Sequence, residues 1–234
     1  MDKFWKWKNS ANQVPELILE GEIASETWWG DEITPKMFKD ELNKHKGKDI
    51  DVWINSPGGD VIAGSQIYTM LKEHTGRVNV KIDGLAASSA SFIAMAGDTI
   101  KMSPTAMMMI HLPSTFDWGD KKDFQKTIAR LEEVEAAIIN AYELKTKLPR
   151  DELAKMMEDE MWMNAYRAKE LGFIDEVLYT DTEDKKEVGF DFSKKKVDNC
   201  IQNSVKQIQD KMKKMSDDVE LEKLKIEIDL LSMQ

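Results

Sequence analysis

Short apolar runs alternate with amphipathic segments over most of the chain. The apolar runs predict strands at residues 15–24, 49–55 and 77–84, and two short strands around a Ser-Pro turn in 99–111. Apolar side chains three and four residues apart predict helices at residues 34–45, 88–96, 120–147 and 150–157, a helix in 56–76 after a Gly-rich turn, and a helix from 164 to Gly172 before a last strand. Strands that alternate with helices form βαβ units, so we expect an α/β fold with a mainly parallel sheet.

The carboxyl ends of three predicted strands carry residues suited to chemistry. These ends read "NSPGGD", "DGLAASS" and "IHLPST" in chain order. Ligands of parallel α/β sheets bind at this edge, so the three segments are expected to converge there.

The second of these segments opens a run of small residues, 81–98, that contains Ser88, Ser89 and Ser91. Small residues allow a helix to pack closely against a sheet, which is a purely structural interpretation. They also leave room for a substrate beside a serine hydroxyl. The run alone leaves both interpretations open.

Residues 120–147 predict a long helix with one apolar stripe. The stripe consists of Phe124, Ile128, Leu131, Val134, Ile138 and Tyr142. A long, otherwise charged helix with such a stripe is expected to pack against a partner.

The chain changes character after about residue 190, where apolar residues recur every three or four positions among lysines and aspartates, without Gly or Pro. One interpretation is one or two amphipathic helices, with a coiled coil as one form. The other is a partly disordered tail, because helical periodicity without a partner does not ensure order.

Composition excludes several classes of function. The net charge of −10 argues against general binding to nucleic acid or to an anionic membrane surface. The 234 residues contain no apolar run long enough to span a bilayer and no secretory signal at the N-terminus. The one cysteine, Cys200, forms no intramolecular disulfide and joins no zinc-binding cluster, which indicates a reducing, cytoplasmic compartment.

A serine nucleophile needs a general base and donors for the oxyanion. The chain has three histidines, of which His45 and His74 lie in charged helix ends or turns and are expected to be solvated. His111 follows an apolar strand at the expected ligand edge, where it is either a general base or a core histidine. Gly58 and Gly59 form either an anion-binding turn or a plain Gly-Pro turn.

Four motifs in order resemble one family. They are "WINSPGGDVIAGSQIYTML", "DGLAASSASFIAMAGD", "MMMIHLP" and "WMNAYRAKELGFIDEV". Together they resemble the ClpP-like serine peptidases, and the opening "LILEGEIASETWWGDEITPKMFKDELN" is similar to their phage branch, the head maturation (prohead) proteases. The resemblance implies a ClpP/crotonase-like fold with a protruding handle helix. It divides the chain into an N-terminal segment (1–14), a peptidase domain (15–185) and a helical or disordered tail (190–234).

The resemblance also implies a role for individual residues. Ser88, rather than Ser89 or Ser91, corresponds to the nucleophile, and His111 corresponds to the base. The backbone N–H groups of Gly59 and Ser89 correspond to the oxyanion donors. The orienting acid corresponds to Glu160, with its neighbour Asp159 as the alternative and an exposed acidic turn as the structural interpretation. No metal or organic cofactor is implied.

Partners and substrates follow from the same resemblance. It implies rings that associate through the handle helix (124–142) and an endopeptidase, ATP-independent or ATPase-assisted, that processes phage scaffold and capsid proteins. Two other functions stay open: a catalytically silent assembly or scaffold protein with this fold, and a crotonase-like acyl-CoA enzyme. The placement of Ser88 and His111 argues against both.

Overall fold

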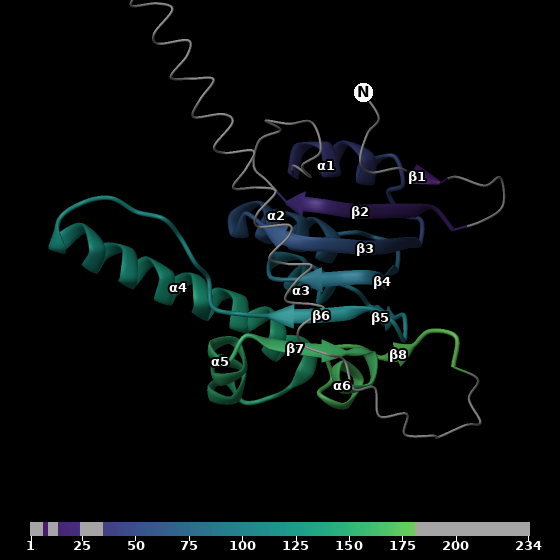
Figure 1. Cartoon of the computed structure of the whole chain (residues 1–234). Coiled ribbons are helices and arrows are strands. Elements are labelled where there is room, and N and C mark those ends of the chain that lie inside the picture. The colour runs from purple at the N-terminus through teal and green to yellow at the C-terminus, as the bar shows by residue number, and fades with distance from the viewer. Residues whose placement is uncertain (1–6, 9–13, 24–34, 181–234) are drawn as a thin grey trace, which may run out of the picture. The chain divides into compact units, whose positions relative to one another are not determined.

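The computed structural model describes residues 7–8, 14–23 and 35–180, which all fall in one compact unit, Met1–Thr182. The described residues form eight strands and six helices (Figure 1). The strands are β1 (Trp7–Lys8), β2 (Glu16–Ile23), β3 (Ile50–Gly59), β4 (Val78–Ala87), β5 (Thr99–Met102), β6 (Met107–Ile110), β7 (Met161–Asn164) and β8 (Glu176–Val177). The helices are α1 (Pro35–Asn43), α2 (Val61–Lys72), α3 (Ser89–Ala94), α4 (Lys121–Thr146), α5 (Arg150–Glu158) and α6 (Ala165–Glu170). The predicted tail, 190–234, lies outside the described residues.

The expected α/β fold with a mainly parallel sheet is confirmed. The strand order is β1-β2-β3-β4-β5-β8, and β2 to β5 and β8 pair in parallel. Strand β4 divides its pairing between two neighbours: residues 79–82 pair with β5, and residues 85–87 pair with β6. Strand β6 then pairs with β7 in antiparallel fashion. This division carries the carboxyl ends of β4 and β6 to the same edge.

The predicted Gly-rich turn at "SPGG" is wrong, because β3 continues through these residues to Gly59. Gly58 and Gly59 pair with Glu22 and Ile23 of β2. Their φ angles of 93° and 146° lie in the region that favours glycine. Residues with a side chain rarely adopt these angles, so glycine at both positions allows the strand to keep its pairing with β2. The glycines therefore shape the end of a strand.

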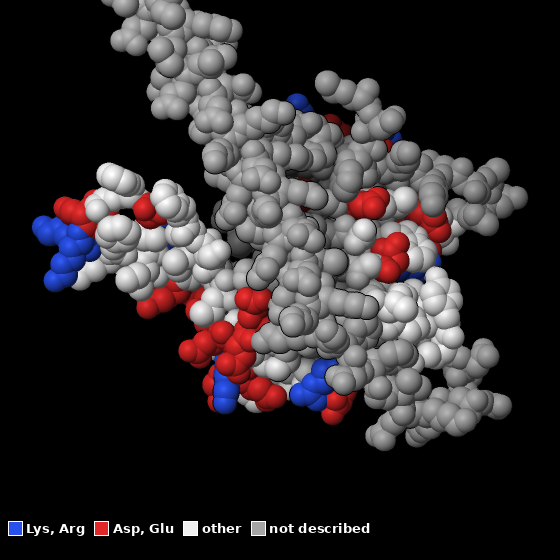
Figure 2. Space-filling view, in the orientation of Figure 1, with Lys and Arg blue, Asp and Glu red and all other residues white. Residues whose placement is uncertain are grey.

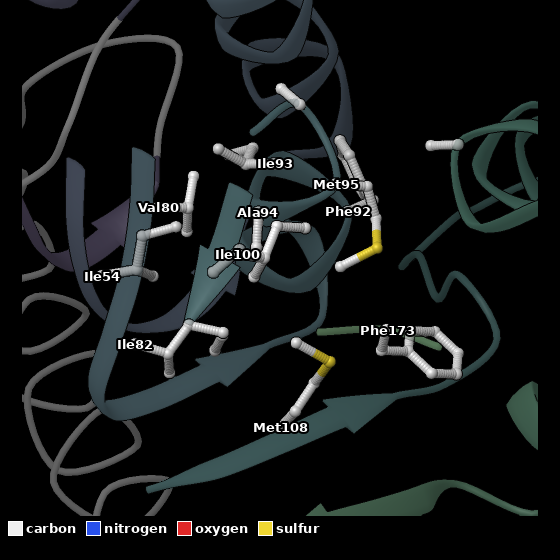
Figure 3. Close-up of a cluster of buried hydrophobic side chains, with 14 of the residues drawn as sticks. Ile54, Val80, Ile82, Phe92, Ile93, Ala94, Met95, Ile100, Met108 and Phe173 are labelled. Atoms are coloured by element: carbon white, nitrogen blue, oxygen red, sulfur yellow. The ribbon is translucent and has the colours of Figure 1, made fainter. Parts of the chain in front are cut away.

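The core lies where α3 packs against the centre of the sheet (Figure 3). Its labelled members include Ile82 of β4, Phe92 of α3 and Phe173, which follows α6. Gly64 of α2 and the small Ser89 of α3 bring these helices close together, because a Cβ on Gly64 would lie 2.8 Å from the Phe92 ring and 3.1 Å from Cβ of Ser89. The packing interpretation of the small-residue run is therefore correct for this helix, whatever the role of Ser88.

The predicted long helix is confirmed as α4, which extends away from the sheet (Figure 1). Asp120 caps its first turn by accepting hydrogen bonds from the backbone N–H groups of Lys122 and Asp123. The apolar stripe, however, divides into two parts. Ile138 and Tyr142 are buried within the subunit, whereas Phe124 and Ile128 are 48% and 56% exposed. Only the outer part of the expected 124–142 contact surface is therefore available to another subunit.

The prediction that His45 is solvated is wrong, since this residue is buried. His45 lies three residues after the buried Leu42, so both side chains face the same side of the turn that ends α1. Burial lowers the pKa of His45. His74 is partly exposed, and its Nε2 lies 2.7 Å from the carbonyl oxygen of Lys48.

No helix in the described part of the chain combines the length and apolar character needed to cross a membrane.

Candidate active site

The parallel pairing of β4 with β6 brings Ser88 and His111 together. Ala87 is in register with Met109, so both strands end at the same edge, one followed by Ser88 and the other by His111. The Oγ atom of Ser88 lies 2.8 Å from Nε2 of His111. This is the contact that a general base makes with a serine nucleophile. The two residues therefore have the geometry of a nucleophile and its general base.

Ser88 occupies an unusual backbone conformation between β4 and α3. Its φ and ψ angles are 54° and −126°, which a residue with a side chain rarely adopts. The N–H of Ser88 donates to the carbonyl of Met109 at 3.0 Å, and its own carbonyl accepts from the N–H of Ser91. Such strain costs about 1–3 kcal/mol and persists only where surrounding contacts enforce it. The sharp turn directs the Ser88 side chain to His111.

Gly58 lies against the turn that carries Ser88, and Gly59 lies against β2. A Cβ on Gly58 would be 2.7 Å from Cβ of Ser88 and 2.8 Å from the backbone nitrogen of Ser89. A Cβ on Gly59 would be 2.0 Å from the carbonyl oxygen of Ile23. The absence of a side chain at Gly58 lets the end of β3 approach Ser88, and the absence of one at Gly59 lets β3 lie close to β2. The backbone of Gly58 therefore lies close to the backbone nitrogen of Ser89, and Gly59 is the next residue of β3.

His111 is partly buried, and this burial lowers its pKa. The negative charge of Glu160 acts in the opposite direction and raises the pKa of His111 by a smaller amount. The lowered pKa favours the neutral imidazole, which is the form that can accept a proton from Ser88.

Glu160 stands next to His111 by strand register. The pairs Met109–Trp162 and Ile110–Met161 end the β6–β7 ladder, and the next position along it matches His111 with Glu160. Glu160 has a positive φ of 48° and accepts a hydrogen bond from Nε1 of Trp162 at 3.2 Å. Among the described residues it makes no hydrogen bond to His111. Glu160 therefore acts on His111 through its charge and not through a hydrogen bond in this structure.

Asp159 differs from Glu160 in its surroundings. It ends helix α5, where its N–H donates to the carbonyl of Lys155 at 2.9 Å. Its side chain is exposed, and the charge that acts on the pKa of His111 is that of Glu160. The geometry favours Glu160 over Asp159 as the partner of His111, while the assignment stays a prediction.

The other two serines of the run are both buried but differ in their contacts. Ser89 Oγ has no hydrogen-bond partner among the described residues. Ser91 Oγ contacts the carbonyl of Ser88 and the hydroxyl of Tyr142 in α4. Sequence reasoning missed this link, although Tyr142 belongs to the predicted stripe and Ser91 lies one helical turn after Ser88. The described residues contain no cluster of three or more His, Cys, Asp or Glu side chains that could hold a metal.

Comparison with known proteins gives one family. The family model described as Clp protease matches residues 9–181. The chain is 31% identical over 176 residues to the ATP-dependent Clp protease proteolytic subunit 1 of Chlamydia pneumoniae. The aligned region covers 70% of this chain and 92% of that protein. It is 35% identical over 134 residues to the ATP-dependent Clp protease proteolytic subunit of Bacteroides fragilis. That aligned region covers 56% of this chain and 65% of that protein.

Proposed function

The chain belongs to the Clp protease family, and we propose that it is a serine endopeptidase subunit that cleaves peptide bonds through an acyl-enzyme. The observation that carries the proposal is the 2.8 Å contact between Ser88 Oγ and His111 Nε2. The strained turn at Ser88 and the close approach of Gly58 to it support the same chemistry.

The proposed reaction proceeds in two steps. Ser88 Oγ attacks the peptide carbonyl while His111 Nε2 takes its proton, and His111 then gives that proton to the leaving amine. Water next hydrolyses the acyl-enzyme, with His111 again as base. The N–H groups of Gly59 and Ser89 donate to the oxyanion, and each such donor typically contributes about 100-fold or more in rate. The negative charge of Glu160 stabilises the imidazolium that forms, and Glu160 is the proposed orienting acid of His111.

The proposed substrates are phage scaffold and capsid proteins during head maturation. This finer assignment depends on the resemblance of residues 17–43 to the phage branch, while the relatives named above are bacterial proteolytic subunits. Assembly is proposed to occur through the outer part of α4, where Phe124 and Ile128 are exposed. An ATPase partner is a further possibility that the names of those relatives suggest.

Reaction with a fluorophosphonate probe tests the proposed chemistry. The purified, folded chain is expected to form a covalent adduct, and peptide mapping is expected to place it on Ser88. The probe reports an activated serine, so it separates an enzyme from a silent assembly protein. A folded chain without adduct, or an adduct on Ser89 or Ser91 instead, would contradict the proposal.

Glu160 and Asp159 are distinguished by charge-neutral substitutions. Glu160→Gln is expected to lower the cleavage rate by about 100-fold, since an orienting carboxylate contributes up to about 10,000-fold in other triads.

The rate of the unchanged enzyme should fall as acid protonates His111, with a midpoint below the ordinary histidine pKa of about 6.5, because burial lowers the pKa of His111.

The pH profile supplies the discriminating measurement. Loss of the Glu160 charge removes the influence that raises the pKa of His111, so Glu160→Gln should move the midpoint to still lower pH. Asp159→Asn is the matched control and should keep both rate and midpoint near those of the unchanged chain. If Asp159→Asn shows the larger loss, Asp159 is the acid; if both losses are small, Ser88 and His111 act as a dyad.

A further inference from the structure

A buried chain of hydroxyl groups joins helix α4 to the backbone of Ser88. Ser91 Oγ lies 2.5 Å from the carbonyl oxygen of Ser88 and 2.7 Å from the hydroxyl of Tyr142. Ser91 and Tyr142 are 0% and 1% exposed, so neither hydroxyl can exchange these partners for bulk water. Tyr142 also packs edge-on against Phe173, with ring centroids 5.6 Å apart, which fixes its ring.

The direction of these hydrogen bonds follows from proton counting. A carbonyl can only accept, so the single proton of Ser91 Oγ is donated to Ser88. Tyr142 must then donate its own proton to Ser91 Oγ. Burial raises the pKa of Tyr142, so this donor keeps its proton over the pH range in which His111 titrates. The order of donation is thus Tyr142 to Ser91 to Ser88.

The acceptor at the end of this chain belongs to the strained residue. The carbonyl of Ser88 accepts from both the N–H and the Oγ of Ser91, while the N–H of Ser88 donates to Met109. A residue at φ 54° relaxes to a negative φ unless its neighbours prevent this. Such relaxation would turn Ser88 Oγ away from His111. The Ser91 hydroxyl is therefore one of the contacts that oppose it.

We propose that Ser91 and Tyr142 are positioning residues, which together hold Ser88 in its strained conformation and keep Oγ directed at His111. The inference rests on the proposed function, since it concerns the reactivity of the same serine. Tyr142 acts only through Ser91, and neither residue touches the substrate. The role also gives the inner part of α4 a function separate from the exposed outer part.

Two variants and their combination test the proposal. Ser91→Ala is expected to lower the maximal rate of fluorophosphonate reaction at Ser88 by about tenfold, or about 1.4 kcal/mol, with unchanged half-saturation by the probe. Tyr142→Phe should give a smaller decrease of the same kind, because Ser91 still donates to Ser88. In the Ser91→Ala background, Tyr142→Phe should cause no further decrease in rate. Tyr68→Phe is the control, since Tyr68 of α2 takes no part in the hydrogen bonds that join Tyr142, Ser91 and Ser88.

Thermal unfolding separates positioning from general stability. Ser91→Ala leaves the buried Tyr142 hydroxyl without its acceptor and should lower the melting temperature, whereas the double variant removes that hydroxyl and should recover part of the loss. Recovery of stability without recovery of rate supports the proposal. Parallel recovery of both, or labelling of the folded variants at the rate of the unchanged chain, overturns this inference alone. Absence of labelling in the unchanged chain overturns the proposed function and this inference with it.

Discussion

Ser88→Ala is expected to abolish peptide cleavage and fluorophosphonate labelling while the fold remains intact. Loss of a serine nucleophile costs roughly a million-fold in comparable enzymes, which places the variant below detection. The described side-chain contact that disappears is the one from Oγ to His111 Nε2. Alanine keeps the Cβ, so the strain at φ 54° is unchanged and the free energy of unfolding should shift by only about 1 kcal/mol. Cleavage assays and thermal unfolding measure the two effects separately.

Ser89→Ala is the matched control for this experiment. It removes the same atom one residue later, from a buried hydroxyl that has no hydrogen-bond partner among the described residues. Because that hydroxyl is unsatisfied, its removal should be neutral or slightly stabilising, and the proposed oxyanion donor at this position is a backbone N–H. Activity close to that of the unchanged chain is therefore expected. An inactive Ser89→Ala beside an active Ser88→Ala would move the nucleophile by one position.

The sequence predicted the main strands and helices because their apolar periodicity reflects which face is buried. Ile54, Ile82 and Met108 in three different strands are buried, as their apolar runs indicated. The short strand β7 escaped detection, because Met161–Asn164 lies directly before a predicted helix. The contacts that make β7 a strand come from β6, about fifty residues earlier in the chain, and local pattern does not contain them.

The candidate site was predicted in part, for a related reason. Ser88 and His111 follow strands whose carboxyl ends share an edge in any parallel sheet, so their convergence was open to prediction. Glu160 was named from the family resemblance alone, since its place next to His111 depends on an antiparallel strand that the pattern did not indicate. Tyr142 was assigned to an apolar stripe because its hydroxyl gives no periodic signal. Only the packed structure brings that hydroxyl to Ser91.

The exposed apolar part of α4 carries the second large expected effect. Phe124→Asp together with Ile128→Asp is expected to dissociate the assembly into smaller species without unfolding the subunit. Both side chains are about half exposed in the single subunit, so they contribute little to its own core. Burying the exposed half of each against another subunit would contribute together about 1.5–3 kcal/mol, which corresponds to about 10- to 100-fold in the dissociation constant. Two new carboxylates in an apolar contact increase the effect further.

Light scattering measures the size of the assembly, and circular dichroism reports whether the subunit stays folded. Gln125→Asp with Ala129→Asp is the matched control, since it adds the same charges at the same spacing on the neighbouring face of α4. This control should keep the size of the unchanged chain, which would show that the stripe matters rather than the helix charge. Figure 2 shows that the same helix already carries basic residues at its far end and acidic residues nearby. If the unchanged chain is already a monomer, or if the control variant dissociates to the same extent, the outer part of α4 is not the contact between subunits.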